Sequence, residues 1–248
     1  MTEDEVHKID ALELSHWWYR GTREIFFSLL APYVEGRAPM RILDVGCGTG
    51  GNLLQLARLG TATGIDLDPL CVEYCRRKGL QASLGSMFDL RTPPGSLDLV
   101  TMFEVLDQAE PEDTGRVLRG IATALRVGGL IAIRGPAMAM AGGAHDRAVN
   151  VRQRVTTAGA RDALVSAGFE PLRITYLNTV LFAPIVASRR LQAIVRPEHV
   201  ASDVQPTPSM LNAALLGVLR AEKVLLKRMN LPFGVSVFAV ARRTARSP

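Results

Sequence analysis

Residues 41–52 constrain this chain more than any other stretch, because a short apolar run ends there in a cluster of glycines. The run is typical of a buried strand, since apolar side chains fall on both of its faces. A helical pattern follows over 52–59. Glycines at a strand-to-helix turn allow positive φ and a close approach of the backbone to a ligand, and the start of a helix offers free N–H groups. The turn predicts a site for a nucleotide-like cofactor.

Asp44, just ahead of the first glycine, indicates which cofactor. Gly46, Gly48 and Gly51 satisfy the dinucleotide pattern G-x-G-x-x-G, and Asp66 follows at a distance suited to a ribose contact. A carboxylate at position 44 would lie badly beside a pyrophosphate, because like charges at short range repel strongly in a partly dry site. It suits a cofactor that carries a sulfonium and an ammonium. The turn therefore favours S-adenosylmethionine over NAD.

Three further segments agree with this interpretation. Residues 64–69 place an acid at a strand end, 85–87 precede an apolar run at 97–100, and 125–133 carry a glycine turn into another apolar run. Together with 43–50, they resemble in order and spacing the four motifs of class I S-adenosylmethionine-dependent methyltransferases. The resemblance implies an α/β fold with a Rossmann-like seven-stranded sheet of order 3-2-1-4-5-7-6, and it implies methyl transfer.

The resemblance also implies which residues contact the cofactor. Asp44 favours the ammonium through a water, and Asp66 holds both ribose hydroxyls. Many relatives carry Asp where this chain has Ser86, so the contact to the adenine amino group is weaker here. The other implied contacts are the methionine part (Gly46, Cys47, Gly48, Gly50), the adenine face and edge (Leu67, Ser86, Met87) and the methyl-donor end (Phe103, Glu104).

The cluster His-Trp-Trp-Tyr-Arg at 16–20 resembles a segment that folds over the cofactor in one branch of this family. The resemblance implies that Trp17 contacts the cofactor and that Arg20 binds its carboxylate, which accepts two parallel hydrogen bonds. Tyr19 is a candidate catalytic residue. The alternative is a helix that only packs on the sheet.

Catalytic residues are harder to predict than cofactor contacts. Methyl transfer needs the acceptor held in line with the methyl group, and a base is needed only if the acceptor must lose a proton. His145 lies after the predicted fifth strand and is the first candidate for that base, with Glu104 and Tyr19 as further candidates. Asp107-Gln108 stands where relatives commonly have Glu-His, which removes one potential base and leaves the acceptor chemistry open.

Composition and charge fit an ordinary globular α/β protein. The chain has 248 residues, of which 48% are hydrophobic and 21% charged, and its three cysteines show no metal-ligand spacing with histidine. The opening Met-Thr-Glu-Asp-Glu lacks a signal segment and predicts a cytoplasmic protein. From Arg173 onwards there are eleven Lys/Arg against three acids. This excess indicates either an anionic partner or a solvated surface.

The pattern divides the chain into a helical cap (1–36), a cofactor-binding core (37–176), a helical insertion (177–231) and a last strand with a tail (232–248). The apolar run at 176–188 is too short to span a bilayer. The insertion suits an acceptor lid, a dimer face or a helix that touches a membrane. Predicted strands lie at 41–45, 62–66, 81–84, 97–102, 129–134, 171–176 and 234–240, and predicted helices at 52–59, 69–78, 114–125, 157–167 and 210–229.

We therefore expect methyl transfer to a small-molecule acceptor that is lipophilic or anionic, of natural-product, prenyl or lipid-linked type. One alternative is a protein that binds the cofactor without transferring methyl groups, as a regulatory or structural partner. A nucleic-acid methyltransferase is disfavoured, because basic residues are not interleaved with aromatic ones and no Asn/Asp-Pro-Pro-aromatic motif follows the fourth strand. A nicotinamide dehydrogenase is the third alternative.

Overall fold

The fold is described by a computed structural model for residues 2–37, 39–137, 155–187 and 205–245. Its strands are β1 (Met40–Val45), β2 (Gly60–Asp66), β3 (Gln81–Leu84), β4 (Leu97–Phe103), β5 (Leu125–Pro136), β6 (Phe169–Leu177) and β7 (Ser236–Arg243). Its helices are α1 (Glu3–Leu12), α2 (Trp17–Val34), α3 (Leu53–Leu56), α4 (Pro69–Arg77), α5 (Thr114–Ala124), α7 (Thr157–Ser166) and α9 (Ser209–Leu226), with short 3-10 turns η1 (Leu106–Gln108) and η2 (Pro111–Asp113).

The seven strands form one sheet in the order β3-β2-β1-β4-β5-β7-β6, as predicted. All neighbouring pairs are parallel except those of β7, which runs antiparallel to β5 and to β6. Val45 pairs with Ile65 on one side and with Met102 on the other, so the carboxyl ends of β1, β2 and β4 reach the same edge. In open sheets of this kind ligands bind at that edge.

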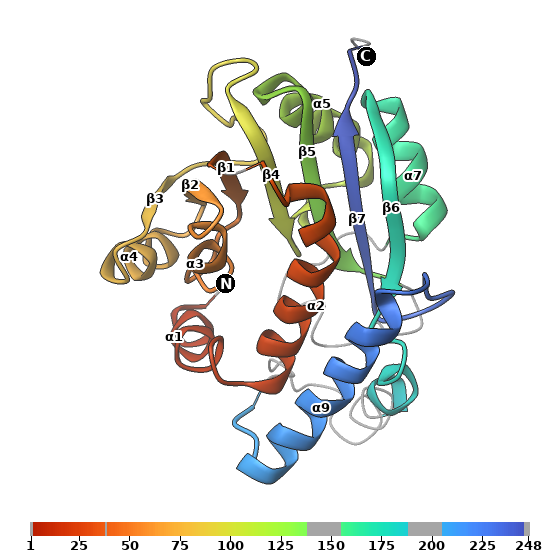
Figure 1. Cartoon of the computed structure of the whole chain (residues 1–248). Coiled ribbons are helices and arrows are strands. Elements are labelled where there is room, and N and C mark those ends of the chain that lie inside the picture. The colour runs from red at the N-terminus through yellow and green to blue at the C-terminus, as the bar shows by residue number, and fades with distance from the viewer. Residues whose placement is uncertain (1, 38, 138–154, 188–204, 246–248) are drawn as a thin grey trace.

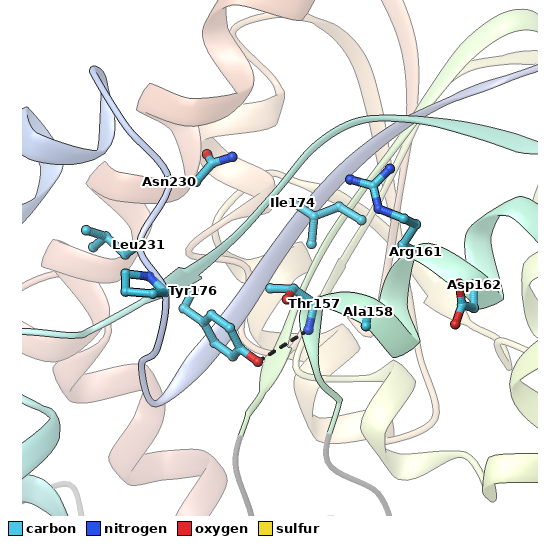
Figure 2. A pocket seen from close by; sticks show the side chains of 9 residues that line it. Thr157, Ala158, Arg161, Asp162, Ile174, Tyr176, Asn230 and Leu231 are labelled. Carbon is cyan, nitrogen blue, oxygen red and sulfur yellow. Dashed lines mark hydrogen bonds between the residues drawn. The ribbon is translucent and has the colours of Figure 1, made fainter.

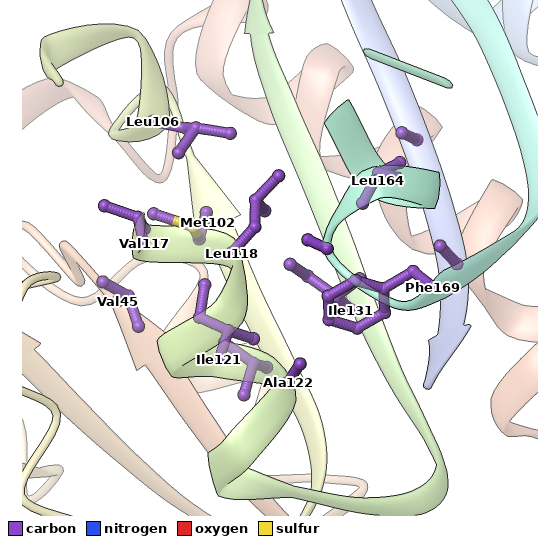
Figure 3. Close-up of a cluster of buried hydrophobic side chains, with 14 of the residues drawn as sticks. Val45, Met102, Leu106, Val117, Leu118, Ile121, Ala122, Ile131, Leu164 and Phe169 are labelled. Carbon is purple, nitrogen blue, oxygen red and sulfur yellow. The ribbon is translucent and has the colours of Figure 1, made fainter. Parts of the chain in front are cut away.

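Helices cover both faces of the sheet, and each face has its own apolar core. In front of the sheet α2 and α9 run side by side, while α5 and α7 lie behind it (Figure 1). Figure 3 shows the rear core, in which Val117, Leu118 and Ile121 of α5 pack on Met102 and Ile131. Burial of such side chains contributes roughly 1.5–3 kcal/mol each. This core fixes the strand ends that carry the site.

Two helices far apart in the sequence, α2 and α9, pack against each other. A Cβ added at Gly21 would overlap the side chain of Leu219, so the glycine permits a close approach of the two helices. Glu24 accepts hydrogen bonds from Arg220 (2.8 and 3.0 Å) and Lys223 (3.0 Å). Arg220 and Lys223, two of the basic residues in the excess after Arg173, therefore form ion pairs within the protein.

The remaining differences from the predicted elements have local causes. The helix predicted at 52–59 is limited to 53–56, because the chain tightens after it: the N–H groups of Arg58 and Leu59 donate to the carbonyls of Gln55 and Leu56, three residues earlier. β5 begins at Leu125, four residues earlier than predicted, since Leu125 pairs with Leu97 across a register shift. Cys71 and Cys75 are fully buried and belong to the core.

Candidate functional site

The glycine turn between β1 and α3 is held by backbone hydrogen bonds within the turn and to β2. The amides of Gly46 and Cys47 both donate to the carbonyl of Ile65, at 2.7 and 3.0 Å. Gly46, Gly48 and Gly50 have φ values of 70°, 53° and 101°, in the region that favours glycine. A Cβ added at Gly48 would meet no atom within 4 Å. The space over Gly48 is thus open to a ligand.

Asp66, at the carboxyl end of β2, lies beside this turn. Its Oδ2 accepts from the N–H of Gly48 and its Oδ1 from the N–H of Asp68, both at 2.9 Å. Burial raises the pKa of Asp66, and the two backbone hydrogen bonds oppose that rise. Each carboxylate oxygen has a second lone pair, which can accept from a ribose hydroxyl.

Asp44, at the end of β1, is a buried carboxylate that is only partly satisfied. The residue is 1% exposed. Its Oδ1 accepts from Thr101 Oγ1 at 2.6 Å, whereas its Oδ2 is buried without a hydrogen-bond partner. Desolvation raises the pKa of Asp44 to about 7, against the effect of the Thr101 hydrogen bond. An unsatisfied buried acceptor costs about 1–3 kcal/mol, so a donor such as an ammonium or a water fits beside Oδ2.

The predicted adenine-side residues follow β2 and β3. Leu67 is 71% exposed, which leaves an apolar side chain next to Asp66 that a flat ring can cover. The Oγ of Ser86 accepts from the N–H of Phe88 at 3.2 Å, and this hydrogen bond stabilises the turn over 86–88. Met87 is partly buried against the rear core.

Glu13, between α1 and α2, ties the N-terminal cap to the glycine turn. Its buried carboxylate accepts from the N–H of Gly51 (2.9 Å) and from Lys78 Nζ (2.5 Å). Lys78 also pairs with Asp10 at 2.7 Å. The sequence analysis expected the helix-start amides to be free for a ligand; at Gly51 this is wrong, because Glu13 already takes the amide.

Arg23 is the cap residue that reaches the glycine turn. Its Nη2 donates to the carbonyl of Glu13 (2.7 Å) and its Nε to Asn52 Oδ1 (3.1 Å). A Cβ added at Gly51 would overlap the Arg23 guanidinium. Arg20, which is predicted to bind the cofactor carboxylate, donates to Glu24 at 3.3 Å and has a side chain that is 49% exposed. Arg23 follows Arg20 by one helical turn in the sequence, and this spacing was the available signal.

The aromatic cluster at the start of α2 is engaged with the C-terminal insertion. His16 Nε2 lies 3.0 Å from Thr207 Oγ1, and burial lowers the pKa of His16. The N–H of Trp17 donates to Asn212 Oδ1 at 2.7 Å, and the Trp17 ring packs against the front core. The contact of Trp17 with the cofactor stays a prediction.

Glu104 and Arg134 form an ion pair at the carboxyl ends of β4 and β5. Glu104 has a φ of 55° and its N–H donates to the carbonyl of Arg134 at 2.7 Å. The Glu104 carboxylate pairs with Arg134 Nη2 at 3.1 Å. Burial, and then the charge of Glu104, raises the pKa of Tyr19, so this phenol stays protonated. Phe103 packs on Phe26, with ring centroids 4.1 Å apart.

Arg134 was missed by the sequence analysis, although a single charged residue in the apolar run 130–136 was a signal. His145 lies outside the described residues. Asp107 is buried, and Gln108 Nε2 donates to the carbonyl of Glu104 at 3.1 Å, so position 108 braces the turn after β4.

A hollow of about 450 Å³ lies elsewhere, against β6 and the start of α7 (Figure 2). Tyr176 faces Thr157 across it, and the Thr157 N–H donates to the Tyr176 hydroxyl at 3.5 Å. None of the sequence-predicted site residues lines this hollow. In the described part of the chain, no group of three or more His, Cys, Asp or Glu could hold a metal ion, and no helix is long and apolar enough to cross a membrane.

These features fit S-adenosylmethionine. The unsatisfied oxygen of Asp44 suits its ammonium, the open space at Gly48 admits its chain, and Asp66 with Leu67 offers a hydroxyl acceptor beside an apolar surface. A pyrophosphate at the same turn would face the carboxylates of Asp44 and Asp66.

Comparison with known proteins agrees with this fit. Residues 42–129 match the family model described as "Methyltransferase domain". The chain is 36% identical over 142 residues to the ubiquinone biosynthesis O-methyltransferase of Xanthomonas oryzae pv. oryzae, a match that spans 51% of this chain and only 58% of that relative.

Solved structures share the fold at lower identity. A putative sarcosine dimethylglycine methyltransferase from Galdieria sulphuraria superposes with a TM-score of 0.61 at 18% identity, over 90% of this chain and 85% of that one. The [4+2]-cyclase SpnF superposes with a TM-score of 0.59 at 20% identity, over 92% and 83%.

Proposed function

We propose that this chain, a member of the class I S-adenosylmethionine-dependent methyltransferases, transfers the methyl group of that cofactor to a small-molecule acceptor. The observation that carries the proposal is the pair of carboxylates around the open glycine turn. Asp44 presents an unsatisfied oxygen, and Asp66 is anchored by the amide of Gly48 with lone pairs to spare. One acid suits an ammonium and the other suits two ribose hydroxyls.

The bound cofactor supplies a methyl group activated by its sulfonium, so the protein mainly holds and orients the acceptor. In our proposal Gly46, Cys47, Gly48 and Gly50 flank the methionine part, and Arg23 rather than Arg20 pairs with its carboxylate, because Arg23 is the guanidinium that contacts the turn. Leu67, Ser86 and Met87 border the adenine. Trp17 supports the cap from behind.

Glu104 is our candidate for the base at the methyl-donor end, where Phe103 forms the apolar wall. Its side chain is 41% exposed and lies on the turn after β4. Tyr19 stays protonated, so it acts as a hydrogen-bond donor instead of a base. His145 remains a candidate base from outside the described residues.

We further propose that the acceptor is lipophilic or anionic. The insertion exposes apolar side chains on α9, among them Met210 and Leu225, which suit a lipophilic acceptor, a membrane surface or a second copy of the chain. The O-methyltransferase relative named for ubiquinone biosynthesis supports a lipophilic small molecule. Sedimentation with vesicles and size-exclusion chromatography separate the membrane contact from the dimer.

Isothermal titration with S-adenosylmethionine, S-adenosylhomocysteine and NADH tests the cofactor. We expect both sulfur nucleosides to bind and NADH not to bind; the reverse result would exclude methyl transfer. Incubation with methyl-labelled cofactor and a panel of lipophilic phenols, acids and amines then tests turnover through the release of S-adenosylhomocysteine.

A cofactor-binding protein without methyl transfer is the second candidate. Gln108 braces the backbone of Glu104 and offers no proton acceptor there. The similarity of the fold to a [4+2]-cyclase shows that this architecture occurs in a protein named for other chemistry. Binding of the cofactor with no labelled product from the panel would favour this candidate.

A further inference from the structure

Arg134 is a buried guanidinium with unused hydrogen-bonding capacity. The residue is 7% exposed and stands near the end of β5, between Phe103 of β4 and Phe238 of β7. Its Nη2 pairs with Glu104 at 3.1 Å, while its Nε is buried and has no hydrogen-bond partner. A guanidinium offers five N–H donors in a fixed plane, so the ion pair to Glu104 leaves the Nε–H without an acceptor.

An unpaired buried donor on a charged group destabilises the folded protein. The apolar neighbours of Arg134 supply no acceptor, because the front core around it is formed by Phe26, Phe103 and Phe238. Apolar residues of similar volume would pack there without that cost. The charge therefore points to a ligand oxygen that completes the hydrogen bonds.

The neighbouring groups define what that ligand carries. Arg134 and Glu104 meet in their ion pair at the carboxyl ends of β4 and β5, and the charges of both act on the Tyr19 phenol. The guanidinium attracts an acidic oxygen and repels an ammonium. Glu104 accepts a proton, and Tyr19 donates a hydrogen bond.

We propose that Arg134 binds the methyl acceptor through an acidic oxygen, so that the acceptor is a phenol, an enol or a carboxylic acid and not an amine. The inference rests on the proposed function and names its acceptor class. For a phenol, the hydroxyl proton passes to the Glu104 carboxylate, the oxygen lone pair forms the new O–C bond, and the electron pair of the broken C–S bond stays with sulfur. Arg134 binds the acceptor oxygen while negative charge develops on that oxygen.

Binding of 4-nitrophenol and 4-nitroaniline tests this inference without turnover. The two probes share ring and size, and the absorbance of the phenol reports its ionisation. With the protein saturated by S-adenosylhomocysteine, we expect the phenol to bind at least about tenfold more tightly than the aniline, and its apparent pKa to fall on binding.

Arg134→Met should remove both the preference and the change in the phenol's pKa, and Arg134→Lys should keep part of each. Arg126→Met is the matched control. Arg126 lies near the start of β5, the strand that also carries Arg134, and it pairs with Asp98 of β4. Melting curves and S-adenosylhomocysteine affinity check that each variant is folded. Equal binding of the two probes, binding of neither, or a preference that survives Arg134→Met overturns the inference. If the unmodified protein did not bind S-adenosylhomocysteine, the proposed function itself would be refuted.

Discussion

The two halves of the site differ in how they are built. The proposed cofactor half is centred on the glycine turn and residues 44–68, which are held largely by backbone amides, and Arg23 joins it from α2. The proposed acceptor half draws on Tyr19, Glu104 and Arg134, which are far apart in the chain and are brought to one region by α2, β4 and β5. A local motif can therefore specify the first half, whereas tertiary packing specifies the second. The halves should respond to different substitutions.

Asp66→Asn should have the largest effect on the cofactor half. Removing the charge weakens the hydrogen bonds to the ribose hydroxyls and to Gly48, so we expect S-adenosylmethionine affinity to fall about a hundredfold, or about 3 kcal/mol. Calorimetric titration measures this. Asp68→Asn is the matched control, because Asp68 caps α4 through the Leu70 amide and asparagine caps equally well. Similar losses in both variants would contradict the special role of Asp66.

The sequence was sufficient for the sheet and for bringing Asp44, Gly48 and Asp66 to one turn. The resemblance to class I methyltransferases implied the strand order, and the positive φ of Gly48 agrees with the glycine turn that the sequence predicts. These features depend on near neighbours in the chain, which a motif records.

The sequence was not sufficient for the contacts between distant segments. Arg20 and Arg23 are equally plausible on paper, and only the packing of α2 directs Arg23 to the turn and Arg20 to Glu24. Glu13 also lies outside the glycine motif, and only the packing of the cap brings its carboxylate to the N–H of Gly51, from which it accepts a hydrogen bond. Pairing of Arg134 with Glu104 depends on the register of β4 and β5, which no local pattern encodes.

Gly21→Ala should disturb the acceptor half through packing. The new methyl group would overlap Leu219, so we expect a loss of about 2 kcal/mol of unfolding free energy, typical of overpacking. Chemical denaturation measures it. Gly217→Ala on the facing helix is the control: a Cβ there meets nothing within 4 Å, and alanine should stabilise the helix by about 0.5–1 kcal/mol. Equal effects would mean that α2 and α9 do not pack closely.

Ionisation of Asp44 should make the affinity for S-adenosylmethionine depend on pH. Its pKa of about 7 means that it is ionised above that pH, so affinity for S-adenosylmethionine should fall as pH drops, by about tenfold between pH 8 and 6. Stability of the free protein should change in the opposite sense. The folded state holds a proton that the unfolded chain has lost, so this contribution is present at acidic pH and is lost as pH rises towards 7. Titrations and melting curves across pH measure both trends.

Asp44→Asn is the control for that prediction, because the amide cannot ionise. Its affinity should be low at every pH, and the fall in stability towards pH 7 should shrink to the part that Asp66, whose pKa is also raised, contributes. A wild-type affinity that does not vary between pH 6 and 8 would place the cofactor's ammonium away from Asp44.

Glu24→Gln should have the smallest effect and should be confined to the acceptor half. The hydrogen bond from Arg220 lowers the pKa of Glu24 to about 2, so its contribution is present above the ordinary glutamate pKa and is lost as pH falls towards 2. The pair is partly solvated, and we therefore expect a loss of about 1 kcal/mol at pH 7 that diminishes below pH 4. Denaturation at both pH values measures it.

Glu73→Gln removes an exposed ion pair to Arg77 within α4 and is the matched control, with an expected loss of about 0.3 kcal/mol. The two variants together test the independence of the halves. Glu24 fastens α9 to the helix that carries Tyr19, so its loss should weaken the binding of the phenol probe while leaving S-adenosylmethionine affinity unchanged. If cofactor affinity fell equally, α2 would transmit the disturbance through Arg23 to the glycine turn, and the two halves would act as one unit.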